Sequence, residues 1–350
     1  MSLDKLKSKV SIEGRSQGAI LIGKHIACDG AQVGRPVSII SHAHGDHTGQ
    51  FESALSLCSS VLMTKETKSL LVADRGEYLN LRRNLIVLAF GEAYTYNDSK
   101  ITLYPTSHIL GSCQASIVNG DGDRIVYTGD FNYPSTPVLE TDVLVMEATY
   151  GHPTSVRDKD QESLIAEFTR IAKSSVEKRK SVSVIAHPGK IQFLMSKLRN
   201  AGVDVPFLSN RKDLQWAQVY EQYQMPVGTV YEIRTPDTST VEKSGDPHVH
   251  FYRYGSTVPD AVGHVKIRVS GLGAHRAIYQ PREDYYVIAL SDHADINGLT
   301  TYVEQSKAKL VIVDGSRCEL AETFARHIKE KLGTEAMALP FQERHPDLTS

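Results

Sequence analysis

Three histidines and one aspartate stand within six residues, in the stretch Ser41-His42-Ala43-His44-Gly45-Asp46-His47. Imidazole and carboxylate groups are the ligands that zinc and similar divalent metals prefer. The apolar run Val37 to Ile40 before them predicts a strand, so the first two histidines should point to the same side of its end. A turn at the glycine would bring the aspartate and the last histidine to an adjacent position. This ordered spacing favours two neighbouring metals over a solvated histidine-rich loop.

Two residues that stand much later in the chain, a histidine and an aspartate, could complete such a site. His108 follows a predicted strand over 101–104, and Asp130 ends another predicted strand beside a glycine. Taken alone, His108 is more typical of a structural histidine than of a metal ligand, and Asp130 is more typical of a turn aspartate. Beside the first cluster they are the ligands that a binuclear site still lacks, with Asp130 able to bridge. Strand ends gather along one rim of a sheet, where sites are usually assembled.

Glu147 and His293 form a second pair of candidates. Glu147 directly follows the apolar run 143–146, which predicts a buried strand. A carboxylate there is either an anchor for a turn or a partner for a catalytic base. His293 stands in the stretch Ser291-Asp292-His293, where the serine or the aspartate could cap the next helix and leave the histidine incidental. The residues alone leave both alternatives open.

Composition limits the class of protein. The chain has 350 residues, of which 41% are hydrophobic and 23% charged, as expected for a globular protein of two domains. No apolar run is long enough to cross a bilayer, and the lysine-rich start has no apolar core behind it, so we expect a cytoplasmic protein without a membrane partner. The four scattered cysteines form no CxxC pair and predict reduced thiols. A net charge of −2 excludes a uniformly basic nucleic-acid binder but allows a local basic groove.

The elements that position these residues change in character along the chain. Short strands and glycine turns dominate the first 150 residues, with a hairpin predicted across Asn119–Gly122. From Ser155 strands and helices alternate, which is typical of an α/β layer domain. The polar, proline-containing segment 235–247 predicts a loop. Helices are expected over 51–57, 158–178, 190–200, 296–305 and 321–331, and strands over 143–146, 182–186, 265–269, 287–290 and 310–313.

The order of these motifs resembles the metallo-β-lactamase superfamily. Asp29, the HxHxDH cluster, His108 and Asp130 carry that likeness, and Glu147 with the SDHAD stretch resembles the β-CASP branch, whose members process nucleic acids. The stretches HILGSCQ, YTGDF, EATYGHP, GKIQFL and ALSDHADINGL are similar to the ligase-associated DNA exonuclease group and to archaeal messenger-RNA 3′-end processing factor-like proteins. The resemblance runs over about 18–338. It implies an α/β fold, namely an αββα sandwich of 1–154 and 285–350 with a compact α/β insert over 155–284.

The resemblance also implies a role for each residue of the motifs. His42, His44 and His108 would hold a first zinc with Asp130 bridging, and Asp46 and His47 would hold a second. Asp29 would brace the metal loop, and Glu147 would hydrogen-bond His293, which would protonate the leaving oxygen. Asp46, Glu147 and His293 are the expected catalytic residues. Relatives place a histidine on the second metal after the strand 310–313, where this chain has Asp314. That aspartate could ligate through oxygen, and its negative charge is expected to weaken the second zinc or to favour Mn²⁺.

The leading hypothesis is therefore a metal-dependent nuclease of single-stranded DNA or RNA, expected to be exonucleolytic. Two metals would activate a water for in-line attack on a phosphodiester, and a histidine would protonate the leaving group. The partners would be single-stranded nucleic acid and DNA-repair or RNA-processing machinery. Basic residues at the insert could line a groove for phosphates, although each fits an ordinary solvated charge as well; the selected ones are Lys190, Arg268, His275 and Arg276.

Two rival functions remain open at this stage. A small-molecule hydrolase of lactamase or glyoxalase type would share the metal motif but would have no need for the insert, Glu147 or His293. A non-catalytic scaffold of the β-CASP kind would be expected to have lost metal ligands, and only Asp314 departs from the pattern. The sequence does not distinguish DNA from RNA, exonuclease from endonuclease, or the polarity of cleavage.

Overall fold

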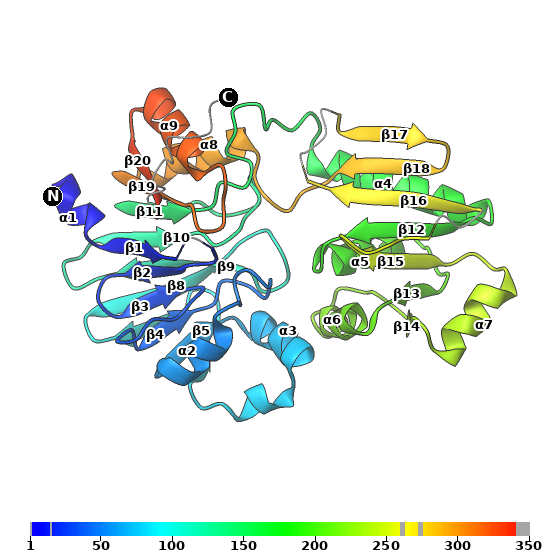
Figure 1. The fold of residues 1–350 in the computed structure, drawn as a ribbon, viewed down its shortest axis with the longest axis horizontal. Helices are drawn as coiled ribbons and strands as arrows, with labels where there is room; N and C mark the ends of the chain where they lie inside the picture. Colours follow the sequence, from blue (N-terminus) through cyan, green and yellow to red (C-terminus); the bar gives the residue numbers. More distant parts are fainter. Residues whose placement is uncertain (1, 15, 260–262, 272–275, 341–350) are drawn as a thin grey trace, which may run out of the picture. The chain divides into compact units, whose positions relative to one another are not determined.

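The computed structural model describes residues 2–14, 16–259, 263–271 and 276–340. The chain divides into two compact units, each described here by itself (Figure 1). The first unit comprises Met1–Lys68, Leu81–Ser155 and His293–Ser350, and the second comprises Ser69–Asn80 and Val156–Asp292. The insert predicted over 155–284 stays a prediction of the domain boundaries; the second unit extends to Asp292 and also takes in Ser69–Asn80.

The first unit contains two sheets. One has the strand order β1-β2-β3-β4-β5-β6 and the other the order β20-β19-β11-β10-β9-β8-β7. The strands of the first sheet are β1 (Val10–Glu13), β2 (Ala19–Ile22), β3 (Ile26–Cys28), β4 (Val37–Ile39), β5 (Ser60–Met63) and β6 (Leu85–Val87). Those of the second are β7 (Ala93–Tyr96), β8 (Ser99–Pro105), β9 (Cys113–Val118), β10 (Arg124–Tyr127), β11 (Val143–Met146), β19 (Leu310–Asp314) and β20 (Glu335–Leu339).

The core of the first unit lies between its two sheets. Ile39 of β4 belongs to the same buried cluster as Val145 of β11 and Ile312 of β19. Successive strand residues point to opposite faces, so Leu144 and Val311 turn away from that cluster. They join a second one with helices α8 (Ile296–Ser306) and α9 (Ala321–Leu332). Burial on both faces explains why β11 and β19 are continuous apolar runs in the sequence. The predicted mixed α/β sandwich is confirmed.

Helices of the first unit flank the sandwich (Figure 1). They are α1 (Leu3–Lys7), α2 (Phe51–Leu57), α8 (Ile296–Ser306) and α9 (Ala321–Leu332). Helix α3 (Lys65–Arg75) begins in the first unit and ends in the second, and the short 3₁₀ helix η1 (Glu77–Leu81) then returns the chain to the first. In the described part of the chain, no helix combines the length and apolar character needed to cross a membrane.

The second unit is built on one largely parallel sheet with the order β14-β13-β15-β12-β16-β18-β17. Its strands are β12 (Ser181–Ala186), β13 (Phe207–Ser209), β14 (Val230–Glu232), β15 (Val249–Arg253), β16 (His264–Ser270), β17 (Ile278–Arg282) and β18 (Tyr285–Ala289). Its helices are α4 (Gln161–Glu177), α5 (Lys190–Asn200), α6 (Arg211–Gln222) and α7 (Pro236–Ser244). Helix α4 packs on β12, β16 and β18, and α5 packs on β12 and β15.

Most predicted elements of regular period are present. The helices over 51–57 and 190–200 and the strand over 143–146 have the predicted bounds. The loop predicted over 235–247 is wrong, because residues 236–244 form α7. The Thr235 side chain accepts a hydrogen bond from the Thr238 backbone nitrogen, and Pro236 occupies the first turn. Both are helix-start signals that the polar composition obscured.

Candidate metal centre and active site

The candidate ligands lie at strand ends along one rim of the first unit. His42 and His44 follow β4, His108 follows β8 and Asp130 follows β10. Strands β8 and β10 run in the same direction because each is antiparallel to β9, so their carboxyl ends meet at the same edge. Gly129 has a φ of +55°, and a Cβ there would lie 2.8 Å from the Ser41 side chain. Glycine therefore allows the Asp130 loop to approach the histidine loop closely.

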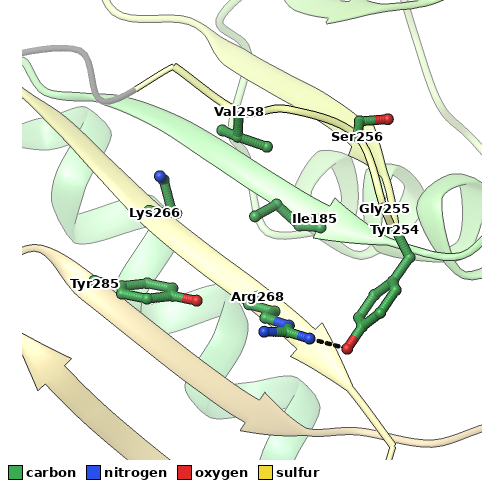
Figure 2. A pocket seen from close by; sticks show the side chains of 8 residues that line it. All are labelled: Ile185, Tyr254, Gly255, Ser256, Val258, Lys266, Arg268 and Tyr285. Atoms are coloured by element: carbon green, nitrogen blue, oxygen red, sulfur yellow. Dashed lines mark hydrogen bonds between the residues drawn. The ribbon is translucent and has the colours of Figure 1, made fainter.

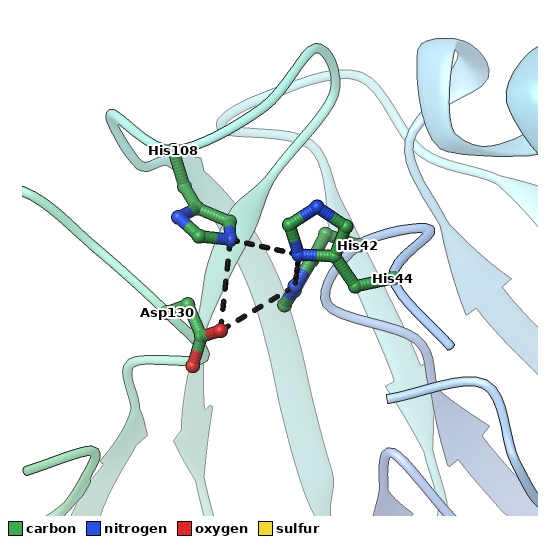
Figure 3. A group of neighbouring side chains, drawn as sticks. All are labelled: His42, His44, His108 and Asp130. Atoms are coloured by element: carbon green, nitrogen blue, oxygen red, sulfur yellow. Dashed lines mark hydrogen bonds and ion pairs between the residues drawn. The ribbon is translucent and has the colours of Figure 1, made fainter. Parts of the chain in front are cut away.

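Four side chains converge at this rim (Figure 3). His44 Nδ1 lies 3.1 Å from His42 Nε2 and 3.1 Å from His108 Nε2. Asp130 Oδ2 lies 3.6 Å from His42 Nε2 and 3.6 Å from His108 Nε2. A tetrahedral ion with bonds of about 2.0–2.1 Å would separate its ligand atoms by about 3.3 Å. The three nitrogens and one oxygen therefore fit a single zinc-sized ion.

Asp46 and His47 lie beside this cluster. His47 Nδ1 donates to Asp29 Oδ2 at 2.7 Å, which leaves Nε2 as the ring atom that can bind a metal. That Nε2 atom is buried, has no hydrogen-bond partner, and lies 3.2 Å from Asp130 Oδ2 and 3.5 Å from Asp46 Oδ2. An orphaned buried nitrogen facing two carboxylates fits a second cation, with Asp130 shared between the two positions.

Asp29 holds the loop that carries these ligands. Its carboxylate accepts hydrogen bonds from the Ser41 backbone and hydroxyl at 2.7 and 2.6 Å, from His47 and from the Tyr127 hydroxyl at 2.6 Å. Burial would raise the pKa of Asp29, but the charges of His47 and Arg317 outweigh it and lower the pKa. The carboxylate therefore stays ionised inside the protein and fixes the His47 ring.

The pKa values of the histidines His42 and His47 are shifted in opposite directions. Burial, followed by the neighbouring rings of His47 and His108, lowers the pKa of His42 well below its usual value. Burial acts in the same direction on His47, yet Asp130 and Asp29 outweigh it and raise its pKa. Burial disfavours the charged form of Asp130, but His47 leads the contacts that hold its pKa low. His42 and Asp130 thus have the protonation states that metal binding requires, whereas His47 would have to release a proton to bind a metal.

Glu147 and His293, which stand 146 residues apart in the sequence, come together in the first unit. His293 Nδ1 lies 2.8 and 3.0 Å from the two oxygens of Glu147. The buried carboxylate is fixed by the Phe131 backbone nitrogen, which donates to it at 2.8 Å. The His293 ring stands edge-on to His108 at 4.8 Å between centroids, and Asp130, Glu147 and His293 form a second group whose ligand atoms lie within 4.8 Å. The pair therefore borders the candidate metal centre.

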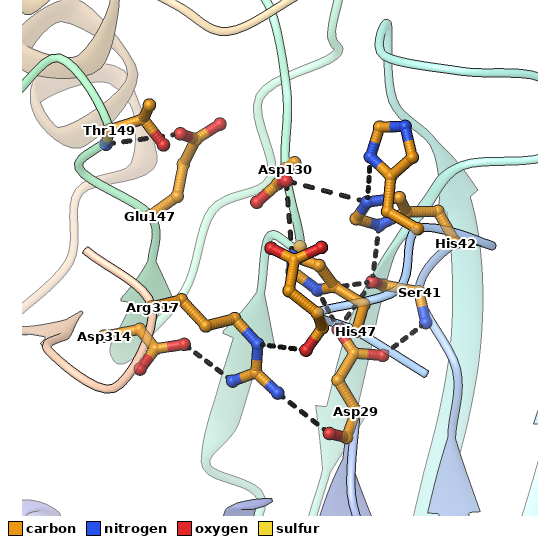
Figure 4. A network of polar contacts seen from close by, with 12 residues as sticks. Asp29, Ser41, His42, His47, Asp130, Glu147, Thr149, Asp314 and Arg317 are labelled. Atoms are coloured by element: carbon orange, nitrogen blue, oxygen red, sulfur yellow. Dashed lines mark hydrogen bonds and ion pairs between the residues drawn. The ribbon is translucent and has the colours of Figure 1, made fainter. Parts of the chain in front are cut away.

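Asp314 does not join either group. One of its oxygens accepts from the Ser316 backbone and hydroxyl, at 2.8 and 2.6 Å, and the other lies 2.9 Å from Arg317 Nη1 (Figure 4). Arg317 also donates to the backbone oxygens of Asp29 and Asp46. Both oxygens of Asp314 thus have protein partners, and its predicted role as a ligand of the second metal stays a prediction. The sequence reading missed Arg317, because a lone arginine has the pattern of an ordinary surface charge.

The basic residues predicted to bind phosphate differ in their surroundings. Lys190 is buried, and its ammonium pairs with Asp292 within the second unit. Arg268 lines a pocket of that unit, and Arg276 is exposed. His275 lies outside the described residues. The role of these residues in binding phosphate stays a prediction.

Comparison with known proteins gives several relatives, although no family profile matches the chain. It is 36% identical over 127 residues to an uncharacterized protein in the lig 3′ region of Acidianus ambivalens, of which it covers 89%. It is 30% identical over 317 residues to a probable DNA ligase of Opitutus terrae, a match that covers 86% of this chain and 28% of that protein. An RNase J-like protein of Methanocaldococcus jannaschii is 28% identical over 212 residues, covering 53% of this chain and 49% of that protein.

A solved structure supports the fold. A protein of unknown function from Enterococcus faecalis has a TM-score of 0.59 and 16% identity, covering 88% of this chain and 79% of that one. At that identity the likeness concerns the fold alone. The relatives, the sandwich and the order of the rim residues agree with the resemblance seen in the motifs. The chain belongs to the β-CASP branch of the metallo-β-lactamase superfamily.

Proposed function

We propose that this chain is a metal-dependent nuclease that hydrolyses phosphodiester bonds of single-stranded DNA or RNA. It would remove nucleotides from one end of the nucleic acid, as an exonuclease does. The observation that carries the proposal is the Glu147–His293 pair beside the four-ligand cluster. Metal ligands alone would suit many hydrolyses. A histidine held by a carboxylate next to them suits a reaction whose leaving oxygen needs a proton, as a ribose or deoxyribose oxygen does.

Different residues of the chain would bind the metals and transfer the proton. His42, His44, His108 and Asp130 would hold a first divalent ion, and His47, Asp46 and Asp130 a second; such ions polarise a phosphate and make bound water acidic. Glu147 accepts the Nδ1 proton of His293, which leaves the opposite nitrogen, Nε2, as the ring atom for proton transfer. In its protonated form that Nε2 gives its proton to the departing oxygen. Glu147 stabilises the imidazolium from which that proton leaves.

The relatives support a nucleic-acid substrate without choosing between its two kinds. One is named as RNase J-like and another as a probable DNA ligase. The chain spans less than half of each of these two proteins, so their activities and partners are suggestions for this chain only. A setting in DNA repair or in RNA processing follows as part of the proposal.

End-labelled single-stranded DNA and RNA, each labelled at either end, test the proposal. With Zn²⁺ or Mn²⁺ present, we expect one of them to shorten progressively and His293→Ala to slow the digestion by roughly 10²–10⁴-fold. His327→Ala, which removes a histidine of α9, is the matched control and should digest normally. Hydrolysis of lactams or thioesters with no digestion of either strand would instead identify a small-molecule hydrolase. Metal binding without any hydrolysis would identify a scaffold.

A further inference from the structure

The second unit contains a pocket of about 340 Å³ that is separate from the metal ligands (Figure 2). Strands β12, β16 and β18 and the segment after β15 form its walls. Its lining residues are Ile185, Tyr254, Gly255, Ser256, Val258, Lys266, Arg268 and Tyr285. Among these described residues there is no carboxylate, and their side-chain polar groups are an ammonium, a guanidinium and three hydroxyls. Such a lining favours an anionic ligand rich in acceptor oxygens.

The two cations share one face of β16. Burial alternates along this strand, with Val265, Ile267 and Val269 buried and the residues between them partly exposed. Lys266 and Arg268 therefore project from the same face, about 6.6 Å apart along a strand that rises about 3.3 Å per residue. Two cations in a row suit two successive phosphates of an extended strand. A lone phosphate would need only one of them.

Arg268 is oriented by aromatic side chains. Its guanidinium donates to the Tyr254 hydroxyl, and its central carbon lies 4.7 Å from the centre of that ring. Tyr254 is in turn stacked on His187, with ring centres 4.8 Å apart and planes 11° apart. Lys266 Nζ lies 5.8 Å from the centre of the Tyr285 ring. A guanidinium held in this way loses little freedom when it binds a phosphate.

We propose that this pocket binds the phosphodiester backbone of single-stranded nucleic acid through Lys266 and Arg268. The identity of the ligand rests on the proposed nuclease function, whereas the site itself rests on the lining. Tyr254 is 39% exposed and offers ring surface beside the cations. A single strand exposes its bases to such surface, whereas a duplex presents mainly phosphates. The pocket would raise affinity for a polymer and would leave the chemical step unchanged.

The test measures the binding of fluorescent single-stranded DNA and RNA in EDTA, which removes metal-dependent cleavage, over a series of salt concentrations. Arg268→Ala and Lys266→Ala should each weaken binding by roughly tenfold and lower the salt slope by about one. Tyr254→Phe should cause a smaller loss, because the ring remains and only the hydroxyl that orients Arg268 is removed. The matched control is Arg170→Ala, an exposed arginine on α4 that pairs with Glu167.

Three results would overturn the proposal. The first is unchanged affinity in the Lys266→Ala/Arg268→Ala double variant, with folding verified by circular dichroism. The second is an equal loss in Arg170→Ala, which would mean a diffuse charge effect. The third is competition by inorganic phosphate or a mononucleotide at the same phosphate concentration, which would mean a site for a small anion.

The outcome is independent of whether the chain is a nuclease. Hydrolysis of bis(p-nitrophenyl) phosphate, which has no polymer backbone, tests the metal centre alone. Strand binding through the pocket with no hydrolysis of either substrate would reject the nuclease function and retain the site. Normal digestion with an unchanged Michaelis constant for polymers in Arg268→Ala would reject the site and retain the nuclease.

Discussion

The Asp314 carboxylate lies 2.9 Å from the Arg317 guanidinium, and both side chains are almost fully buried. The same guanidinium donates to the backbone oxygens of Asp29 and Asp46 (Figure 4). It also donates to the backbone oxygen of Gly18. It therefore connects the strand end at Asp314 with the loop that carries Asp46 and His47. A permanent cation is thus paired with the aspartate that the family resemblance offered as a ligand for the second metal. The Arg317 charge neutralises Asp314, and its hydrogen bonds hold the loop that carries Asp46 and His47 in place.

Removal of Arg317 should destabilise the first unit and the second metal position together. Arg317→Met keeps a long apolar stem but leaves Asp314 buried without its partner, which costs about 3–5 kcal/mol. Denaturant unfolding measures the loss, and metal titration should show weaker binding of a second equivalent. The Asp314→Asn/Arg317→Met double variant should lose less than the single one. Lys309→Met breaks an exposed pair with Asp142 and should have almost no effect, so an equal loss there would contradict the assigned role.

Asp29→Asn should weaken metal binding without removing a ligand. The amide cannot hold the charge that fixes the His47 ring, and loss of such an outer hydrogen bond lowers metal affinity by roughly 10–100-fold. Metal content after dialysis against a weak chelator measures the change. Tyr127→Phe removes one hydrogen bond to the same carboxylate and should have a smaller effect. Full metal retention in Asp29→Asn would show that the loop is held by Arg317 alone.

The general-acid role of His293 predicts a dependence on the leaving group. His293→Ala should strongly slow hydrolysis of a polynucleotide, whose leaving oxygen needs a proton, and should spare a nitrophenyl ester, whose leaving group does not. Glu147→Gln should do less, because the imidazole remains but loses the charge that orients it. Turnover of both substrates by each variant, with metal content measured in parallel, gives the comparison. Equal losses on both substrates would mean that His293 is structural.

The sequence predicted those parts of the molecule that local rules determine. The apolar run of β11 and the period of α5 specify their own bounds. The approach of His293 to Glu147, which stand 146 residues apart, came only from the family resemblance. The fate of Asp314 could not be read from the chain, because it depends on Arg317 folding back over three backbone oxygens. Lys190 illustrates the same limit, since its burial against Asp292 is a property of packing.

His250 predicts how the stability of the second unit changes with pH. Burial, followed by the neighbouring rings of His248 and His264, lowers the pKa of His250 to about 4, and its Nε2 atom has no hydrogen-bond partner. In the unfolded chain the same ring binds a proton near pH 6.5. The unfolded state therefore binds more protons than the folded state between these two values, so stability falls as the pH drops from about 6.5 to about 4, by about 3 kcal/mol at most.

Replacement of His250 should flatten this part of the pH profile. His250→Phe keeps the stacking on Tyr252, whose ring centre is 3.9 Å away, and removes the group that titrates. At pH 7 the variant should be at least as stable, because no unpaired polar nitrogen stays buried. Urea unfolding followed through Trp216, the chain's single tryptophan, reports on this unit. The stability difference between variant and unmodified protein should grow in favour of the variant from pH 7 to pH 5. A constant difference over this range would mean that His250 titrates normally in the folded protein.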